Sequence, residues 1–440
     1  MLMSKHSLLR AAWLLGASLL LAARPGLAQG DAPPALRLEP AAEALIERGV
    51  NNSAELAGAL AKLREAEAEL GIARADGAPK LDLKAEAGKA HEQRSDGQKS
   101  SRVDGQRRQA NLTFRWELDL FGRQRARSQA AQAQQAAVEA DLQAARLALA
   151  NSLRAELLRL RSAGLAQRQR GELLATLQHQ QQLEQMLLAA GLRGAGDQLE
   201  GEAELEQRRA ELAQQEQQRQ HALLRLVRLS DIEAGEWQAL ADGPLPEHRV
   251  PAQLPLQSLA QRPDVRAAEA RLRGSSASAT AAKAALWPSV ALEANMQRLR
   301  NGGGLAGALR DSTDRFLGLG LAWALLDGGE RRAQRDAAQA RAELAAAEFR
   351  RVTLEAAEET QGALARAQEL GSAANHADRA ARQARQAAQL SEQRYRLGID
   401  SLLQRLRQDR QALERELLAQ DLRGEQLQAA LKLERALARP

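Results

Sequence analysis

The amino-acid sequence predicts a mainly α-helical chain that also contributes a few strands to a membrane β-barrel, and three observations lead to this prediction. Long stretches of good helix formers run without proline, short segments alternate apolar with polar side chains, and the same order of elements occurs twice. We therefore interpret the 440 residues as one unit used twice, and not as two or three unrelated globular domains.

The N-terminus has the features of a secretory signal peptide. Basic residues precede an uncharged run, and Gly26-Leu27-Ala28 forms a small-x-small cleavage site. The uncharged run is shorter than the about 20 residues that span a bilayer, so we expect residues 1–28 to be cleaved. No later stretch offers about 18 consecutive apolar residues, which excludes a chain of several membrane-spanning helices.

The composition excludes several other classes of protein. The chain has no cysteine, so we expect no disulfide, no thiolate metal site and no lipid anchor attached through cysteine. Half of the formal net charge of +6 comes from Lys5, Arg10 and Arg24 in the expected signal peptide. Aromatic residues make up only 2% of the chain, so stacking platforms are lacking and we expect no nucleic-acid partner.

The two units are separated by a proline-rich linker. We place the first unit at residues 29–241, the linker at 242–260 and the second unit at 261–440. Each unit is expected to run in the order helix, strand, loop, strand, long helix, turn and long helix.

The expected strand pairs lie at about 80–120 and about 288–326. In each pair one face is apolar, as at Leu83 and Leu292, while the residues between them are charged or polar. This alternation is expected of a membrane β-barrel with lipid outside and water inside. Four strands cannot close a barrel, since the smallest use about eight, so copies of the chain must combine.

Polar stretches and tryptophans mark the ends of these strands. We expect loops over Ser95–Gln109 and Asn301–Asp314, which are rich in glycine, serine, aspartate and arginine. Trp116, Trp287 and Trp323 lie near strand ends and are candidate anchors at the membrane interface.

The long helical hairpins are expected over about 123–230 and about 330–436. A helix that starts at residue 123 and ends near residue 190 reaches roughly 100 Å at ~1.5 Å per residue. Such lengths suit a thin wall of helices and not a thick core, although an ordinary coiled coil has the same periodicity. The apolar positions with heptad-like spacing include Ala126, Ala130, Ala133 and Ala137, and in the second unit Ala333, Ala337, Ala340 and Leu344.

Several stretches carry a family resemblance that covers essentially the whole mature chain. They are Trp116-Glu117-Leu118-Asp119-Leu120-Phe121-Gly122-Arg123, Gln261-Arg262-Pro263-Asp264 with the following helix, Trp287-Pro288-Ser289, Leu326-Asp327-Gly328-Gly329 and Tyr395-Arg396-Leu397-Gly398-Ile399-Asp400-Ser401. With them the chain resembles the TolC-type outer-membrane efflux proteins that work with resistance-nodulation-division pumps.

The resemblance implies a homotrimer in the outer membrane of a Gram-negative bacterium. Each protomer would give four strands to one 12-stranded barrel, which continues into the periplasm as a barrel of long helices. The protein would act as a passive exit duct for small molecules, supplied by an inner-membrane transporter through a periplasmic adaptor. Opening would come from a small rotation of helix pairs, and no cofactor is implied.

The resemblance also assigns roles to the turns of the hairpins, where the adaptor is expected to dock. A tight reversal between helices commonly needs a positive φ, which we expect at Gly194 and Gly398. Candidate residues of a pore constriction are Asp400, Gln404 and Arg407. The expected adaptor contacts are Arg193, Gly194, Ala195, Gly196 and Asp197 in the first turn, and Arg396, Leu397, Gly398, Ile399, Asp400 and Ser401 in the second.

Two other classes of function were weighed. An enzyme is not expected, because the histidines show no metal-binding spacing and no cluster of carboxylates differs from ordinary helix surface pairing. A soluble periplasmic or secreted coiled-coil protein, structural or adaptor, is the alternative that fits the helices best. It leaves the amphipathic strand pairs in both units unexplained.

Overall fold

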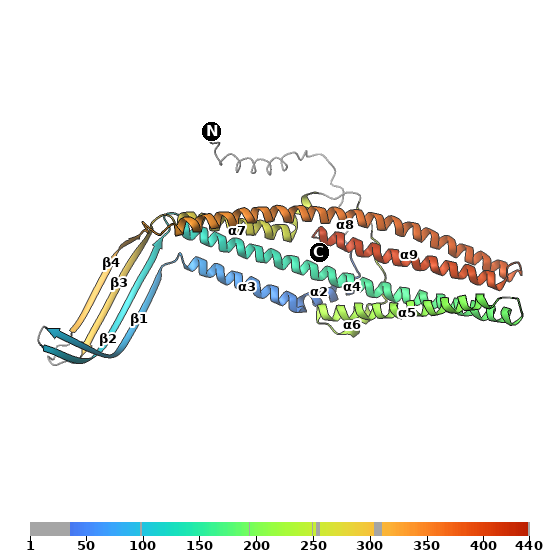
Figure 1. Cartoon of the computed structure of the whole chain (residues 1–440), viewed down its shortest axis with the longest axis horizontal. Coiled ribbons are helices and arrows are strands. Elements are labelled where there is room, and N and C mark those ends of the chain that lie inside the picture. Colours follow the sequence, from blue (N-terminus) through green and yellow to red (C-terminus); the bar gives the residue numbers. More distant parts are fainter. Residues whose placement is uncertain are drawn as a thin grey trace, which may run out of the picture.

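The computed structural model describes residues 36–96, 99–192, 194–248, 250–251, 256–302 and 310–438, so the expected signal peptide lies outside the described residues. The molecule is elongated, with a sheet at one end and the turns of two helical hairpins at the other (Figure 1). Its elements are α2 (Pro40–Asn52), α3 (Ala54–Ala75), β1 (Lys80–Asp96), β2 (Lys99–Leu118), α4 (Arg123–Ala189), α5 (Ala195–Ser230), α6 (Ala234–Ala239), the 3₁₀ helix η1 (Leu256–Gln261), α7 (Pro263–Ala284), β3 (Ser289–Gly302), β4 (Arg310–Ala322), α8 (Glu330–Arg396) and α9 (Leu402–Ala436).

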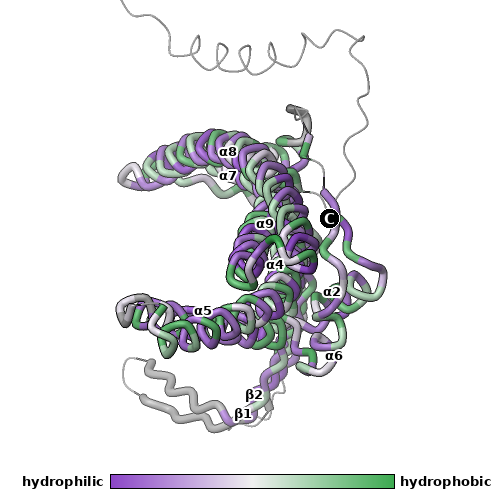
Figure 2. The backbone as a smooth tube through the Cα atoms, turned by 90° about the vertical axis from the view of Figure 1, so that its right-hand side faces the viewer, coloured by the Kyte–Doolittle hydropathy of each residue, from purple (hydrophilic) through white to green (hydrophobic). Residues whose placement is uncertain are grey.

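The helices form a single curved wall. α4 and α8 are each 67 residues long, which corresponds to about 100 Å. Near the hairpin turns α4 contacts α5 and α9, and α9 contacts α8; near the sheet α7 lies between α4 and α8. Viewed along the long axis the wall is C-shaped, with α2 and α6 on its outer side (Figure 2). Among the described helices, none has both the length and the apolar character that crossing a membrane requires.

The position of α8 at one edge of this wall corrects an expectation from the sequence. The heptad-like positions Ala333, Ala337, Ala340 and Leu344 are exposed, and Leu344 retains 69% of its accessible surface. In the part of the chain that the structure describes, no helix covers that stripe, since the elements that contact α8 are α7, α9 and η1.

The main hydrophobic core lies in the middle of the molecule. There α2 and α6 pack on α4, α5 and α9, and Leu153, Leu157, Leu226 and Trp237 are completely buried. Burial of a side chain of this size contributes about 1.5–3 kcal/mol, so this cluster provides much of the packing energy of the protomer. The Trp237 indole N–H donates to Ser230 Oγ at 3.1 Å, which satisfies its polar group.

Two buried arginines fasten connecting segments to this middle section. Arg161 on α4 is fully buried, donates to the carbonyls of Leu240 (2.9 Å) and Pro244 (3.1 Å), and forms an ion pair with Glu39. Its hydrogen bond to Glu39 lowers the pKa of that carboxyl, although burial opposes the shift. Gly243 lies so close that a Cβ there would be 2.3 Å from the Arg161 guanidinium.

The second buried arginine, Arg262, fixes the start of α7 to the neighbouring helices. It donates to the Ala436 carbonyl at 3.0 Å, to Glu359 at 2.6 Å and to Asp264 at 2.7 and 3.1 Å. Burial disfavours its charge, but the bonds to Asp264 and Glu359 outweigh this and raise the pKa of Arg262. One side chain therefore joins the first turn of α7 to α8 and to the end of α9.

The sheet is antiparallel with the strand order β1-β2-β3-β4. The strands are longer than expected: β1 extends to Asp96 and β2 starts at Lys99, so most of the expected loop over Ser95–Gln109 is strand. At the expected loop over Asn301–Asp314, β3 extends to Gly302 and β4 starts at Arg310, while residues 303–309 lie outside the described residues. Backbone pairing does not require apolar side chains, so the polar composition of these segments was misleading.

The register gives the sheet two different faces. Residues directly opposite each other in neighbouring strands point to the same side, so Leu83, Leu112 and Met296 share one face. This face is apolar and open to solvent in the protomer, with Leu83 71% exposed and Leu317 74% exposed. The opposite face is charged, with ion pairs such as Lys84 to Glu86 (2.7 Å).

Candidate functional site: the hairpin turns and the charged clusters behind them

The turn between α4 and α5 is closed by a glycine other than the expected one. Gly191 has φ 72°, and its N–H donates to the Leu188 carbonyl at 2.9 Å, while Leu192 N–H donates to the Leu187 carbonyl at 2.8 Å. This pairing is a Schellman motif, in which glycine supplies the left-handed residue after the helix. Gly194 instead has φ −91° and is the N-cap of α5, so its expected positive φ is wrong.

Only part of the predicted contact set in the first turn is visible. Arg193 lies outside the described residues, and Ala195, Gly196 and Asp197 belong to the first turn of α5. Leu192, which the sequence analysis did not select, is 72% exposed at the tip.

The turn between α8 and α9 closes in the same way and carries the expected glycine. Gly398 has φ 72°, and Ile399 N–H donates to the Arg394 carbonyl at 2.9 Å. The hydroxyl of Ser401 accepts the N–H of Gln404 at 3.1 Å and so caps α9. Leu397 and Ile399 are 75% and 60% exposed, so this turn presents two large apolar side chains to its surroundings.

The three candidate constriction residues do not form one cluster in the protomer. Asp400 accepts hydrogen bonds from Arg394 Nε at 3.0 Å and from Ser391 Oγ at 3.2 Å, and its side chain is only 15% exposed. It therefore serves the turn itself. Gln404 and Arg407 are exposed on the first turns of α9.

A charged cluster one turn further along couples α8 to α9. Arg405 forms an ion pair with Glu392, lies 3.5 Å from Asp409 and places its guanidinium 5.7 Å from the centre of the Tyr395 ring. Burial raises the pKa of Asp409, and the nearby Glu392 adds to this, while Arg405 opposes it.

A second cluster joins the two hairpins to each other. Arg410 on α9 donates to Glu204 on α5 at 2.9 Å, and Arg208 on α5 donates to Glu414 on α9 at 3.2 Å. Burial opposes the charge of Arg208, but Glu211, Glu414 and Glu204 together raise its pKa. We name Glu204, Arg208, Arg410 and Glu414 the inter-hairpin quartet. Sequence analysis missed it, because helical periodicity within one hairpin does not reveal the register between hairpins.

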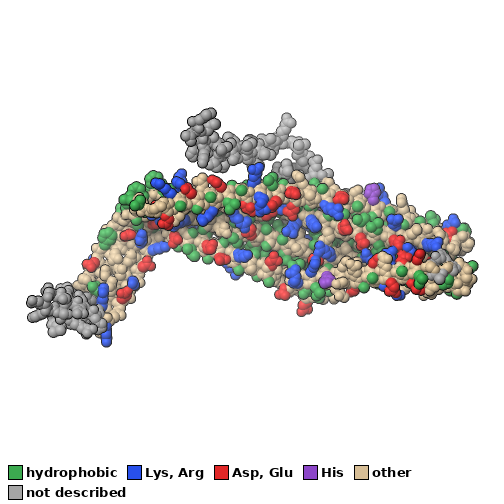
Figure 3. Space-filling view, in the orientation of Figure 1, with side chains coloured by type: hydrophobic (Ala, Val, Ile, Leu, Met, Phe, Trp, Pro, Cys, Tyr) green, Lys and Arg blue, Asp and Glu red, His purple; other side chains and the backbone are tan. Residues whose placement is uncertain are grey.

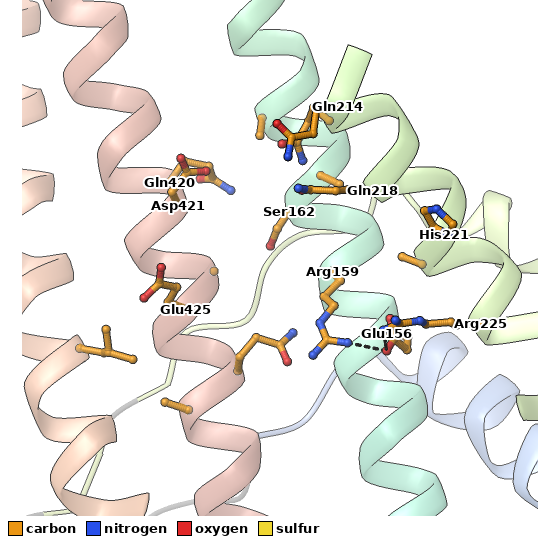
Figure 4. A pocket seen from close by; sticks show the side chains of 18 of the residues that line it. Glu156, Arg159, Ser162, Gln214, Gln218, His221, Arg225, Gln420, Asp421 and Glu425 are labelled. Carbon is orange, nitrogen blue, oxygen red and sulfur yellow. Dashed lines mark hydrogen bonds and ion pairs between the residues drawn. The ribbon is translucent and has the colours of Figure 1, made fainter. Parts of the chain in front are cut away.

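A pocket of about 980 Å³ lies between α4, α5 and α9 on the sheet side of this quartet. In Figure 4, Arg159 and Arg225 approach Glu156 on one wall, while Asp421 and Glu425 project from α9 on the other. Glu156 accepts from Arg159 Nη1 at 2.5 Å and from Arg225 Nη1 at 3.3 Å. The pocket thus has charges of both signs, which suits water and polar solutes and favours neither cations nor anions.

The junctions between strand and helix have an aspartate in both halves of the chain, and these aspartates fix the sheet to the wall. The carboxylate of Asp119 accepts the N–H groups of Gln124 (3.0 Å) and Arg125 (2.9 Å), which caps α4. Asp327 accepts the N–H of Arg331 at 3.3 Å at the start of α8.

The three candidate anchor tryptophans lie at these junctions. The indole N–H of Trp116 donates to the Gly77 carbonyl at 3.2 Å, and that of Trp323 donates to the Leu286 carbonyl at 3.3 Å. Trp287 stacks on Phe121 with ring centres 5.5 Å apart. Their exposed fractions are 36% for Trp116, 52% for Trp323 and 57% for Trp287, so part of each side chain remains open to the surroundings.

The surface of the helical part mixes acidic and basic side chains throughout (Figure 3). Within the described ranges, no group of three or more histidine, aspartate or glutamate residues gathers in an arrangement that could hold a metal ion. A curved helical wall with paired charges and an apolar-faced sheet at one end is the architecture of a channel-forming membrane protein.

Comparison with known proteins agrees with this class. A family model described as outer membrane efflux protein matches residues 45–230 and 254–439. The pyoverdine export outer membrane protein OpmQ of Pseudomonas putida is 30% identical over 414 residues, covering 90% of this chain and 86% of that protein. Outer membrane protein OprJ of Pseudomonas aeruginosa is 29% identical over 405 residues, covering 89% and 83%.

Solved structures share the fold over nearly the full length. The outer-membrane channel OprN matches with a TM-score of 0.79 at 27% identity, covering 95% of this chain and 99% of that chain. The CmeC outer membrane channel of Campylobacter jejuni has the same fold, with a TM-score of 0.78 at 17% identity over 94% of this chain and 90% of that one.

The chain therefore belongs to the outer membrane efflux protein family. It is a TolC-type efflux channel of the outer membrane, a transport protein and not an enzyme, as the sequence predicted. The alternative of a soluble coiled-coil protein is not favoured by these relatives.

Proposed function

We propose that three copies of this chain form a passive exit duct, in which the sheets close into one 12-stranded barrel and the helices into a periplasmic α-helical barrel. The observation that carries this proposal is the sheet, which exposes an apolar face while its outer strands β1 and β4 pair with no further strand in the described part of the chain. Open strand edges in lipid leave backbone groups unsatisfied, so neighbouring copies must supply the missing partners.

The exposed stripe on α8 supports the same assembly. Leu344, Leu354 and Leu390 are 69%, 61% and 59% exposed on a helix that forms the edge of the wall. On the opposite edge, Ile72 of α3 is 64% exposed. Apolar side chains on both edges are suited to helix contacts between copies of the chain.

We further propose that the protomer consists of two structural repeats, residues 29–241 and 261–440, joined by the linker 242–260, and that residues 1–28 are a cleaved signal peptide. The equal lengths of α4 and α8, and of α3 and α7 at 22 residues each, support the repeat.

The family and the tips of the hairpins support two further partners. An inner-membrane resistance-nodulation-division transporter would supply energy and substrate, and a periplasmic adaptor would dock on the turns. The exposed Leu192, Leu397 and Ile399 support this docking, because three large apolar side chains at one end of a molecule suit a protein contact. The contact set comprises Arg193, Gly194, Ala195, Gly196, Asp197 and Arg396 to Ser401.

Asp400, Gln404 and Arg407 are proposed to form the narrow end of the duct, and Trp116, Trp287 and Trp323 to lie at the membrane interface. The constriction is tested by planar-bilayer conductance of the Arg407→Glu and Asp400→Arg variants. Reversed charges at the constriction should raise the leak conductance, and an unchanged conductance in both variants would refute this assignment.

The duct itself is tested by assembly. The chain has no cysteine of its own, so a variant with one cysteine on β1 and one on β4 has no other thiol in the protein. In the trimer, the cysteine on β1 of one copy should form a disulfide with the cysteine on β4 of the next copy. In outer membranes, oxidation should link neighbouring copies into a ladder that ends at the trimer, and the detergent-extracted protein should have the mass of three chains. A soluble monomer or dimer without cross-links would contradict the proposal.

A further inference from the structure

The apolar face of the sheet ends in a row of basic side chains. Across the strands, Arg108 lies opposite Arg300, which lies opposite Asp311, so these three side chains share the face of Leu83 and Leu112. Arg298 and Arg315 occupy the two rows nearer the helices. Lys89 on β1 lies opposite Gln106, on the same face and one row further from the helices. We name Lys89, Arg108, Arg298, Arg300 and Arg315 the outer basic band.

Charge on the two faces of the sheet is distributed very differently. Among the strand residues whose side chains are described, Asp311 is the only acid on the apolar face, set against the five cations of the outer basic band. It contacts Arg298 at 3.0 Å and Arg300 at 3.3 Å. On the opposite face the charges nearly balance: the described acids are Asp82, Glu86, Glu117, Glu293 and Asp314, and the described bases are Lys80, Lys84, Arg107 and Arg115.

The distance of the outer basic band from the helix end of the sheet is close to the thickness of the apolar part of the outer membrane. Below it, the rows of Leu118, Trp116 and Phe114 are apolar across β2, β3 and β4. Arg108 lies ten residues beyond Leu118, or about 34 Å along the strand at ~3.4 Å per residue. With strands tilted by about 40°, this is about 26 Å along the membrane normal, close to the ~25 Å apolar band of outer-membrane barrels.

We propose that the outer basic band binds phosphate groups of lipid headgroups in the outer leaflet of the outer membrane. This proposal rests on the duct described above, whose helices place the far ends of the strands on the cell surface. Guanidinium groups bind phosphate through paired hydrogen bonds, and arginine side chains reach upward from the apolar rows to the headgroup level. Asp311 holds Arg298 and Arg300 side by side, while Arg108 and Arg315 have no acid opposite them in the register.

The test uses the full-length protein, extracted from outer membranes and titrated with lipid A that carries both phosphates. Native mass spectrometry counts bound lipids and reports the number of chains in the same spectrum. Removing two cations with Arg108→Gln and Arg300→Gln should raise the dissociation constant about 25-fold, since each basic group near an anionic surface contributes about a factor of five.

The matched control removes the same charge from the other face. Arg107→Gln with Arg115→Gln neutralises two arginines of the same strand that face away from lipid, and this variant should bind lipid A as the unmodified protein does. Dephosphorylated lipid A should bind about as weakly as phosphorylated lipid A binds to the Arg108→Gln and Arg300→Gln variant.

Three results would overturn the lipid site while leaving the duct intact. These are a trimer that binds phosphorylated and dephosphorylated lipid alike, a control variant that weakens as much as the Arg108→Gln and Arg300→Gln variant, and displacement of lipid A by an equal concentration of inorganic phosphate, which would indicate a simple anion site. A monomer in the spectrum would overturn the duct and the lipid site with it.

Discussion

The middle of the molecule and its helical tip both use arginine with carboxylate, but in different surroundings. In the middle, Arg161 and Arg262 are buried, and each holds a connecting segment against a leucine-rich core. At the tip, the four side chains of the inter-hairpin quartet each remain about a quarter to a third exposed. Breaking a buried pair costs several kcal/mol, whereas an exposed pair contributes about 0–1 kcal/mol. We therefore expect the ion pairs of the middle to contribute more to stability than those of the tip.

The largest effect is expected in the middle section. Arg262→Ala removes the bonds to the Ala436 carbonyl, Asp264 and Glu359 at once, and should destabilise the protein by about 3 kcal/mol. Thermal unfolding of the detergent-solubilised protein measures this. Arg366→Ala is the control, because Arg366 is 55% exposed and its ion pairs, with Glu369 on α8 and at 3.9 Å with Glu425 on α9, are exposed. If both variants unfold at the same temperature, burial of Arg262 does not set the stability of the middle.

A smaller effect on stability, but a visible one on conductance, is expected at the inter-hairpin quartet. Arg208→Gln with Arg410→Gln removes the two ion pairs of the quartet between α5 and α9 and leaves the apolar contact of Leu205 with α9 in place. We expect the intact quartet to belong to the closed arrangement. At about 1 kcal/mol in total, the ratio of closed to open arrangements should then fall about fivefold, which single-channel recording measures as leak. Arg209→Gln is the control, since Arg209 forms its ion pair with Glu206 within α5. Equal leak conductance in both variants would show that the quartet does not stabilise the closed channel.

The two turns provide a test of backbone conformation. Gly398→Ala forces a side chain into the left-handed region and should cost about 1 kcal/mol, whereas Gly194→Ala should cost less because φ there is −91°. Hydrogen exchange of the tip peptides compares the two variants. Faster exchange after Gly194→Ala than after Gly398→Ala would contradict the assignment of the turn glycines.

The smallest expected effect is the pH dependence of stability. The pKa of Asp264 in the middle is lowered, whereas the pKa of Asp409 at the tip is raised. The hydrogen bond to Arg262 lowers the pKa of Asp264 despite burial, so its stabilising charge is present above the ordinary value of about 3.9 and is lost only below it. Burial raises the pKa of Asp409, so its destabilising charge disappears already above that value as the pH falls.

Unfolding temperatures of asparagine variants between pH 3 and 7 make this measurable. At pH 7, Asp264→Asn should unfold earlier than the unmodified protein, and Asp409→Asn at the same temperature or later. On acidification the difference for Asp409→Asn should vanish first. The reverse order would mean that burial does not govern the charge of Asp409.

The sequence predicted the long helices well and the pairings between them poorly. α4 and α8 were predictable because alanine, glutamine, leucine and arginine continue without proline until a glycine ends each helix. The partners of Arg262 lie about 97 and 174 residues further along the chain, and no periodicity encodes such distances. Asp400 was assigned to a constriction from the motif alone, and its bond to Arg394 became visible only in three dimensions.

The strand ends and the first turn were mispredicted for local reasons. Polar side chains in β1 and β2 were interpreted as loop, although a strand beyond the apolar band has polar side chains on both faces. In the first turn Gly191 and Gly194 lie three residues apart, and either could close a helix. Only the hydrogen bonds of the C-terminal turn identify Gly191.

The equal length of α4 and α8 places the two hairpin turns at the same distance from the sheet. Both helices span the distance from the sheet to the tip with 67 residues. The returning helices α5 and α9, with 36 and 35 residues, span part of the same distance in the opposite direction. Removing seven residues from α4 alone would raise one tip by about 10 Å and leave the other in place. Any lengthening or shortening of this molecule must therefore be made in several helices at once, by whole numbers of heptads, to keep the two tips level.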